Sequence, residues 1–502
     1  MSDETPMSYP NGQGGRKVND RPQPDTWHTM ASVPVPYNVP MAFSADFPQE
    51  WEYMLADLFR LWASKLARNR LRMRYYSGKN VLHDFGISIP PQLLSVETVV
   101  GWPQKAVDTM AVRSRFDGFS ASDPDTQDML DRISAASRLR VKYRQAIQST
   151  LIYSCSFATV AVGADGSPRI DIHSAETAAA RWDDALGRIA YGMTITGWRD
   201  GNPTSVNLYT EDYRVSLWND GRSFWEWVAQ PYAMGRPTME ALVYRPTQSK
   251  PFGQSRITRA VMSITDSAVR ESLRTEISAE FFTSPQKYLL GADRDALRGK
   301  TKWEAYIGNI MGVSYNGVDG VMPQFGQLQQ ASMQQTVDYM RLLAARFSGE
   351  TNVPISQLGV IHDNPSSAEA IYAASEPLII ECQDLNDNSR ETLRSLAQMC
   401  MAAEQGVPLA ELGPEWRDFT PNFANPAMPS IVSTADAAVK IAAAVPGFAG
   451  TEAFWKMLGL PEDTRREVRA ELTEATADAM LAQIFSAPTE PAEPEEPTDG
   501  GE

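Results

Sequence analysis

The strongest pattern in the sequence is an apolar stripe between positions 255 and 283. Its members recur every three or four residues among charged positions, first as Ile257, Val261, Ile264 and Ala268 and then on a neighbouring line as Val269, Leu273, Ile277 and Phe281. The spacing predicts a helix about 40 Å long, at ~1.5 Å per residue. Because one narrow stripe on so long a helix needs neighbours, the pattern favours a wall built of many copies over the core of a lone enzyme.

Two further helices are predicted downstream. Residues 331–348 carry an apolar side made of Met333, Val337, Met340, Ala344 and Phe347. A polar loop, 349–364, leads to a long helix over 365–405, whose start matches the capping-box pattern Ser366-x-x-Glu369. Pro377 lies inside this helix and removes a backbone hydrogen bond, so we expect a kink near Ser375.

The segment between the first two long helices, 284–330, has short β-rich runs and the turn pairs Asn316-Gly317 and Asp319-Gly320. These features predict a small projection at the end of an antiparallel helix pair. Beyond residue 406, helical patterns recur at about 431–445, 451–458 and 462–484. The tail, 487–502, is rich in Pro and Glu, and we expect it to be disordered.

The first half of the chain changes character near residue 151. Residues 1–46 are rich in Pro, Gly, Ser and Asn, which predicts a loosely ordered arm. After this arm, a helix is predicted with an apolar face made of Trp51, Leu55, Leu58, Trp62 and Leu66. Two further helices are predicted at about 95–115 and 127–148. From 151 to 244, short alternating runs are separated by Asp-Gly pairs at 165, 200 and 220, which favour the positive φ of tight hairpins. The fold class is therefore α+β: a mainly helical multidomain protein with an inserted antiparallel β region.

Composition limits the function classes. The chain has 502 residues and a formal net charge of −16, so bulk charge does not hold a nucleic-acid backbone. No apolar run approaches the ~18–20 residues of a membrane span, and no signal pattern opens the chain. The three cysteines, Cys155, Cys382 and Cys400, are far apart, which predicts buried thiols in a reducing compartment.

Motifs for catalysis or cofactor binding are incomplete. The run Gly299-Lys300-Thr301 resembles the end of a phosphate-binding loop, but the position that needs the first glycine is Arg294. The four histidines are dispersed, and the acidic loop 123–128 lacks the glycine and terminal glutamate of a calcium loop. We therefore predict no catalytic residue, no cofactor and no metal site.

Two segments have both a structural and a functional interpretation. The basic-aromatic run 68–76 could contact DNA or a scaffold, or it could be the exposed end of a helix whose tyrosines cap a core; the second interpretation is favoured. The loop 349–364 could be an ordinary helix connection or a mobile functional loop, since its length and its Pro, Asn, Gly and His content suit both.

Four motifs, in this order and spacing over about residues 50–440, resemble the portal proteins of tailed phages, in particular the head-to-tail connectors of actinobacteriophages. They are GWPQKAVDTM at 101–110 running to FDGF at 116–119, PFGQSR at 251–256, VPISQLG at 353–359 and NPSSAEA at 364–370. The resemblance implies a ring, usually of twelve subunits, at one vertex of the capsid, with DNA pumped through its central tunnel. It places the protein in the virion, and in the host cytoplasm during assembly.

The resemblance also implies the roles of the segments. Residues 47–254 become the wing, 255–283 and 331–348 the stem, 284–330 the clip, 349–364 the tunnel loop, 365–405 a long kinked helix of the wing, and 406–486 the crown. Tunnel-loop candidates are Gln357, His362, Asp363 and Asn364; stem-packing candidates are Ile257, Val261, Ile264, Ile277, Val337 and Met340; Pro377 is the kink. The implied partners are other copies of the chain, the large terminase, a neck or adaptor protein, the major capsid or scaffold protein, and double-stranded DNA bound without sequence specificity. No membrane partner is implied.

Two other function classes stay open at this point. One is a capsid scaffold or adaptor without a channel, and the other, less favoured, is an enzyme domain on a helical scaffold. The second has few residues left for it beyond the low-complexity tails. A ring with an axial hole, a compact particle or neither would separate the three hypotheses by electron microscopy.

Overall fold

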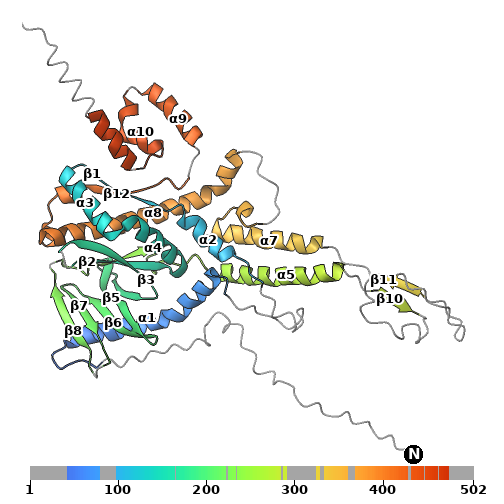
Figure 1. The fold of residues 1–502 in the computed structure, drawn as a ribbon, viewed down its shortest axis with the longest axis horizontal. Helices are drawn as coiled ribbons and strands as arrows, with labels where there is room; N and C mark the ends of the chain where they lie inside the picture. Colours follow the sequence, from blue (N-terminus) through green and yellow to red (C-terminus); the bar gives the residue numbers. More distant parts are fainter. Residues whose placement is uncertain are drawn as a thin grey trace, which may run out of the picture.

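The computed structural model describes residues 42–79, 98–163, 166–221, 224–232, 234–283, 287–290, 324–327, 333–359, 368–427, 431–445, 447–461 and 463–473. They form a mixed body of helices and sheets, from which two long helices extend to one side and on which a C-terminal helical unit stands (Figure 1). The predicted α+β class with an antiparallel β region is confirmed.

Four helices form the N-terminal part of the body: α1 (Gln49–Tyr76), α2 (Trp102–Ala111), α3 (Pro124–Ser137) and α4 (Leu139–Tyr153). The single helix predicted over 127–148 is wrong, because the chain breaks at Arg138. That residue has a φ of 48°, in the left-handed region, and so ends α3 and begins α4. No glycine or proline occurs at the break, so the sequence did not indicate it.

Two antiparallel sheets follow. The first has the order β3-β2-β9, made of β2 (Cys155–Val162), β3 (Pro168–Ser174) and β9 (Met239–Val243). The second is a meander of β4 (Ala178–Asp183), β5 (Arg188–Arg199), β6 (Asn202–Tyr209), β7 (Tyr213–Trp218) and β8 (Glu226–Pro231). Asp200 and Gly201, with φ of 51° and 79°, turn β5 into β6, as the Asp-Gly pair predicts.

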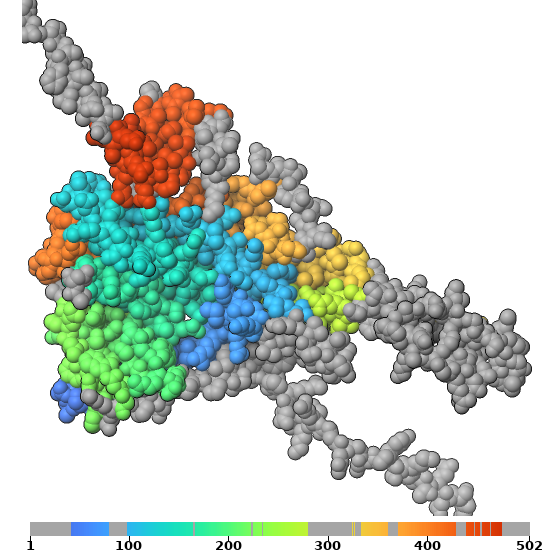
Figure 2. Space-filling model, in the orientation of Figure 1, coloured from blue at the N-terminus to red at the C-terminus, as the bar shows by residue number. Residues whose placement is uncertain are grey.

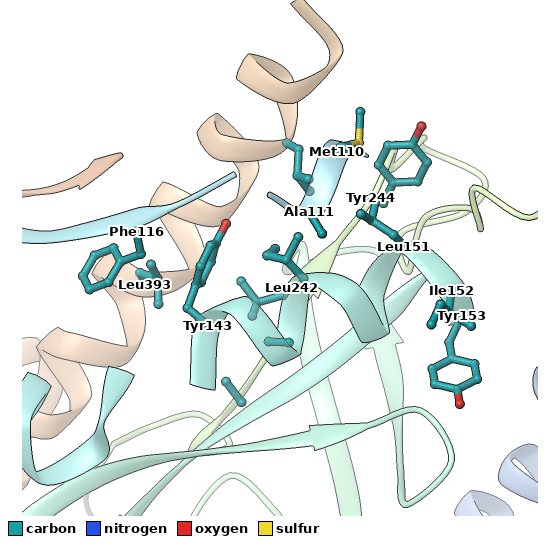
Figure 3. Close-up of a cluster of buried hydrophobic side chains, with 14 of the residues drawn as sticks. Met110, Ala111, Phe116, Tyr143, Leu151, Ile152, Tyr153, Leu242, Tyr244 and Leu393 are labelled. Carbon is teal, nitrogen blue, oxygen red and sulfur yellow. The ribbon is translucent and has the colours of Figure 1, made fainter. Parts of the chain in front are cut away.

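The apolar face of α1 covers the five-stranded sheet. Leu55, Leu58, Trp62 and Leu66 pack with Val206, Leu208, Val215 and Leu217 in one buried cluster. A larger cluster lies behind the three-stranded sheet, where Tyr143 and Leu151 of α4 lie near Leu242 of β9 (Figure 3). This larger cluster also includes residues from both long extended helices, so the body and these helices share one core.

The two extended helices are α5 (Arg259–Thr283) and α7 (Gln334–Thr351), which lie side by side (Figure 1). At their far end, β10 (Lys287–Leu290) pairs antiparallel with β11 (Gln324–Gln327). After α7 comes a single 3-10 turn, η5 (Ile355–Gln357), and then α8 (Ala368–Gln405). Pro377 lies inside α8, which continues on both sides of it; the kink itself stays a prediction.

After α8, the chain first contacts the body again and then forms a separate C-terminal unit. Following η6 (Leu409–Glu411) and η7 (Glu415–Arg417), β12 (Phe419–Phe423) pairs antiparallel with β1 (Phe116–Ala121), a contact that the sequence pattern did not predict. The C-terminal unit comprises α9 (Ile431–Ala444), η8 (Phe448–Gly450), α10 (Glu452–Met457) and the helical residues 463–473.

Two expectations from composition can be compared with the described residues. No helix among them is long and apolar enough to cross a membrane. The predicted burial of the three thiols is confirmed, since Cys155, Cys382 and Cys400 are all buried and unbridged. Burial raises the pKa of the Cys155 and Cys382 thiols to about 12, so neither is a ready nucleophile at neutral pH.

Candidate functional site at the base of the stem

The first half of the apolar stripe predicted over 255–283 is covered by other helices of the same chain. Ile257, Val261 and Ile264 are buried, and they belong to the same core cluster as Leu343 and Phe347 of α7. The other stem-packing candidates lie farther from the body and are only half-buried: Ile277, Val337 and Met340. The two extended helices, called the stem from here on, therefore have a base that is packed within the chain and an outer part whose apolar side chains are only half-buried.

A buried arginine holds this base together. Arg256, three residues before α5, is 3% exposed, and its guanidinium donates to four groups from four segments. Its Nε donates to the carbonyl oxygen of Ala106 at 2.6 Å, and its Nη1 donates to the hydroxyl of Tyr244 at 2.8 Å and to the carboxylate of Glu381 at 2.9 Å. Its Nη2 donates to the carbonyl oxygen of Thr351, at the end of α7.

The partner carboxylate is held equally tightly. Glu381, on α8, also accepts hydrogen bonds from the Tyr244 hydroxyl and from Asn352 Nδ2 at 3.3 Å, and Arg245 Nε lies 3.3 Å from it. Burial by itself would raise the pKa of the Glu381 carboxyl, but Arg256 and the Tyr244 hydroxyl outweigh it, so this pKa lies below its usual range. Glu381 is therefore ionised at neutral pH, and the buried charges are paired.

This network has a mechanical consequence. It ties the start of α5 and the end of α7 to α2, to α8 and to the chain after β9, so the stem cannot rotate on the body without breaking it. In the sequence, Arg256 is marked only as the last residue of the PFGQSR motif. Its position directly before the first apolar residue of the stripe, Ile257, is the one sequence feature that could have indicated its buried role.

The PFGQSR motif also contains a glycine that the turn requires. Gly253 has a φ of 67°, and a Cβ placed on it would lie 2.2 Å from the carbonyl oxygen of Tyr244. That close approach accompanies the hydrogen bond from the Gln254 amide to the same carbonyl oxygen, at 2.8 Å. The glycine thus lets the lead-in to α5 fold back onto Tyr244, next to Arg256.

We predict that Gly253→Ala destabilises the protein more than Gly187→Ala does. Both glycines have positive φ, but a Cβ on Gly187 meets nothing within 4 Å, whereas one on Gly253 meets backbone. Gly187→Ala is the control and should lower the free energy of unfolding by about 1 kcal/mol, because of its left-handed conformation alone. Gly253→Ala should lower it by ~1–3 kcal/mol more. Chemical denaturation of both variants measures the difference, and equal losses would contradict the tight packing of the lead-in.

The loop after α7 begins on the body. The Trp102 indole Nε1 donates to the carbonyl oxygen of Leu358 at 3.1 Å, and its ring lies 5.4 Å from the ring of Phe347. Val353 and Leu358 are buried, while Gln357, in η5, is half-buried. The GWPQ and VPISQLG motifs therefore meet at the base of the stem. The other tunnel-loop candidates, His362, Asp363 and Asn364, lie outside the described residues.

The basic-aromatic run belongs to the body. It forms the last turns of α1, where the Tyr75 hydroxyl donates to both carboxylate oxygens of Asp266 on α5 at 3.0 and 2.9 Å. Burial, and next the Asp266 charge, raise the pKa of Tyr75 well above its usual value. The Tyr76 hydroxyl donates to Asp108 at 2.9 Å. The tyrosines of this run therefore join α1 to the stem base and to α2, as the structural interpretation expected.

Comparison with known proteins agrees with these motifs. A family model described as phage portal protein, SPP1 Gp6-like, matches residues 57–480. The portal protein of Mycobacterium phage D29 is 25% identical over 447 residues, covering 85% of this chain and 90% of that protein. The portal protein of Mycobacterium phage L5 is 25% identical over 442 residues, covering 84% and 88%.

Two solved assemblies contain chains with some structural similarity to this one. One is the virion of a native gene transfer agent particle, in which the similar chain covers 78% of this chain and 93% of its own length, at 13% identity and a TM-score of 0.40. The other is the neck of a native particle of the same kind, computed with C12 symmetry, with coverage of 78% and 99%, 12% identity and a TM-score of 0.39.

Proposed function

Because the chain belongs to the SPP1 Gp6-like family of phage portal proteins, we propose that it forms the ring through which double-stranded DNA is packaged and ejected at one capsid vertex. Members of this family are structural proteins of the portal vertex, and this chain is one of them. The observation that carries the proposal is the family match over residues 57–480, which includes both stem helices and the long helix α8.

The outer faces of the helices support a ring of identical subunits. Tyr339 and Leu342 of α7 and Ile371, Tyr372 and Ile380 of α8 are 41–54% exposed, although all are large and apolar. Tyr339 and Leu342 lie one turn apart on the same face of α7, and an exposed apolar face of this kind marks a contact surface. We assign these faces to contacts with adjacent copies, which would complete the wall that the long helices suggest.

The roles of the segments follow from the same proposal. The antiparallel β10–β11 pair stands where the clip, 284–330, is expected, at the end of two antiparallel helices, and would face the large terminase and later a neck or adaptor protein. The loop 349–364 would reach the tunnel as its narrowest part, and the C-terminal helices would form the crown. The wing, 47–254, would meet the capsid or scaffold protein in the virion, after assembly in the host cytoplasm.

A catalytic role has little support. The matched family is one of portal proteins, which are structural proteins. The buried ionic network at the stem base has its charges paired, as a structural network requires, rather than poised for proton transfer. The scaffold and enzyme hypotheses are therefore not favoured.

The test is an electron-microscopy reconstruction of the purified full-length protein. We expect closed rings with an axial hole, the β10–β11 pair at one end of the stem, and the segment 349–364 facing the hole. Compact particles without a hole, or an open scaffold, would overturn the ring. A ring whose hole is lined elsewhere would keep the portal function and remove the tunnel-loop assignment.

A further inference from the structure

A cationic cavity lies between the body and the C-terminal unit. It has a volume of about 580 Å³ and is lined by α4 and the β1–β12 ribbon on one side and by residues of the C-terminal unit on the other. In Figure 2 this unit stands on the body as a separate lobe. The charged lining residues are Arg115, Arg140, Arg144, Lys456 and Arg465 against the single carboxylate of Asp117.

The cavity forms where the two parts are joined by charge. Arg140 donates to both carboxylate oxygens of Asp463 at 2.7 and 3.0 Å, and Arg465 lies 3.9 Å from Asp117. The Arg140–Asp463 pair is exposed to solvent, which weakens it, whereas Arg465 is buried. Arg466 of the C-terminal unit also pairs with Asp131 of α3. A ligand that binds both sides of this seam would add to these ion pairs.

Positive charge remains after these pairs form. Arg115 and Arg144 are exposed at the cavity, and neither forms an ion pair or a side-chain hydrogen bond within the described residues. This local excess stands out in a chain whose net charge is −16. Two guanidinium groups of the body thus line the cavity with no carboxylate assigned to them, opposite Lys456 of the C-terminal unit.

The donor set favours phosphate over carboxylate. One guanidinium fork can satisfy a carboxylate, which has two oxygens, whereas a phosphate group offers three or more and suits several arginines at once. Asn425 adds a further donor, because its Oδ1 accepts from the Ala427 amide at 3.0 Å and its amide nitrogen is left to donate. The volume lies within the ~300–1,000 Å³ typical of small-ligand sites and exceeds what one phosphate group fills.

We propose that this cavity binds phosphate esters, and that a bound phosphate joins Arg115 and Arg144 of the body to Lys456 of the C-terminal unit and so fixes that unit in place. The phosphate can come from a free nucleotide or from the backbone of DNA. The site does not depend on ring formation, because its lining comes from one subunit.

The test measures binding of inorganic pyrophosphate to the full-length protein by titration calorimetry at low salt. Arg115→Gln/Arg144→Gln should weaken binding at least tenfold. The matched control is Arg60→Gln/Arg199→Gln, which removes the same charge from exposed positions outside the cavity and should stay within twofold of the unchanged protein. Absence of saturable binding to the unchanged protein, or equal loss in both double variants, would overturn the site.

Competition identifies the source of the phosphate. Displacement of pyrophosphate by ADP alone indicates a nucleotide site, and displacement by a short single-stranded DNA indicates contact with the backbone; either supports the proposal. Stronger displacement by hexaglutamate than by both would overturn it in favour of an acidic peptide. Hydrogen exchange gives a separate readout: pyrophosphate should slow exchange in residues 454–461 and 463–473 of the unchanged protein and not of the Arg115→Gln/Arg144→Gln variant.

Discussion

Replacing Arg256 with methionine is expected to lower the free energy of unfolding by about 3–5 kcal/mol, because it leaves the carboxylate of Glu381 buried without its main partner. The side chains of the pair are 2% and 8% exposed, so water cannot take over the role of the guanidinium. The carbonyl oxygens of Ala106 and Thr351 lose their donor as well. Chemical denaturation of the purified protein measures the loss.

Two variants show whether the buried charge is the cause. Arg259→Met, three residues on and exposed, should change stability by less than ~0.5 kcal/mol. Arg256→Met/Glu381→Gln should recover part of the loss, since a neutral amide keeps partners in Tyr244 and Asn352 without an unpaired charge. Equal effects of Arg256→Met and Arg259→Met would mean that the network does not hold the stem to the body.

The same pair gives a pH dependence. The pKa of Glu381 is lowered in the folded protein, so its contribution to stability is present above the unfolded value of about 4.3 and is lost as the pH falls through the folded value. In Arg256→Met the isolated carboxyl becomes easier to protonate, which relieves its burial. The stability difference between the two proteins should therefore be largest near pH 7 and should shrink below about pH 4.

Local patterns in the sequence predicted the parts of the fold that local chemistry decides. The three- and four-residue spacing of Ile257, Val261 and Ile264 placed one face of α5 in the core, and the Asp200-Gly201 pair placed a hairpin turn. The break between α3 and α4 was missed because Arg138 adopts a left-handed conformation that arginine does not favour. Tertiary packing, rather than propensity, decides such a position.

Contacts between distant segments were beyond the reach of periodicity. The pairing of β1 with β12 and the network around Arg256 each join residues far apart in the chain, and no local pattern specifies such partners. The cavity at Arg115 and Arg144 was missed for the same reason, since its lining comes from four separate stretches of sequence. Family motifs marked the regions that meet at the stem base, but not the bonds that they make there.

Leu342→Asp is expected to abolish ring formation and leave the subunit folded. Leu342 is 54% exposed on α7, opposite the buried residues Leu343, Ala344 and Phe347, so a carboxylate there costs the isolated subunit little. In a ring the same face would be covered by the next copy, and burying an unpaired carboxylate at every subunit contact costs several kcal/mol each time. Light scattering should report subunits in place of rings, with an unchanged circular dichroism spectrum and thermal transition.

Two comparisons separate assembly from folding. Leu186→Asp makes the same change at a position that is 61% exposed in the turn between β4 and β5, away from the stem, and should form rings in normal yield. Ile264→Asp places the charge on the inner face, where Ile264 is 5% exposed within the subunit's own core, and should lower the stability of the subunit itself. Normal rings from Leu342→Asp would show that this face of α7 points to solvent in the assembly, and the contact between copies would then have to be sought on the exposed face of α8.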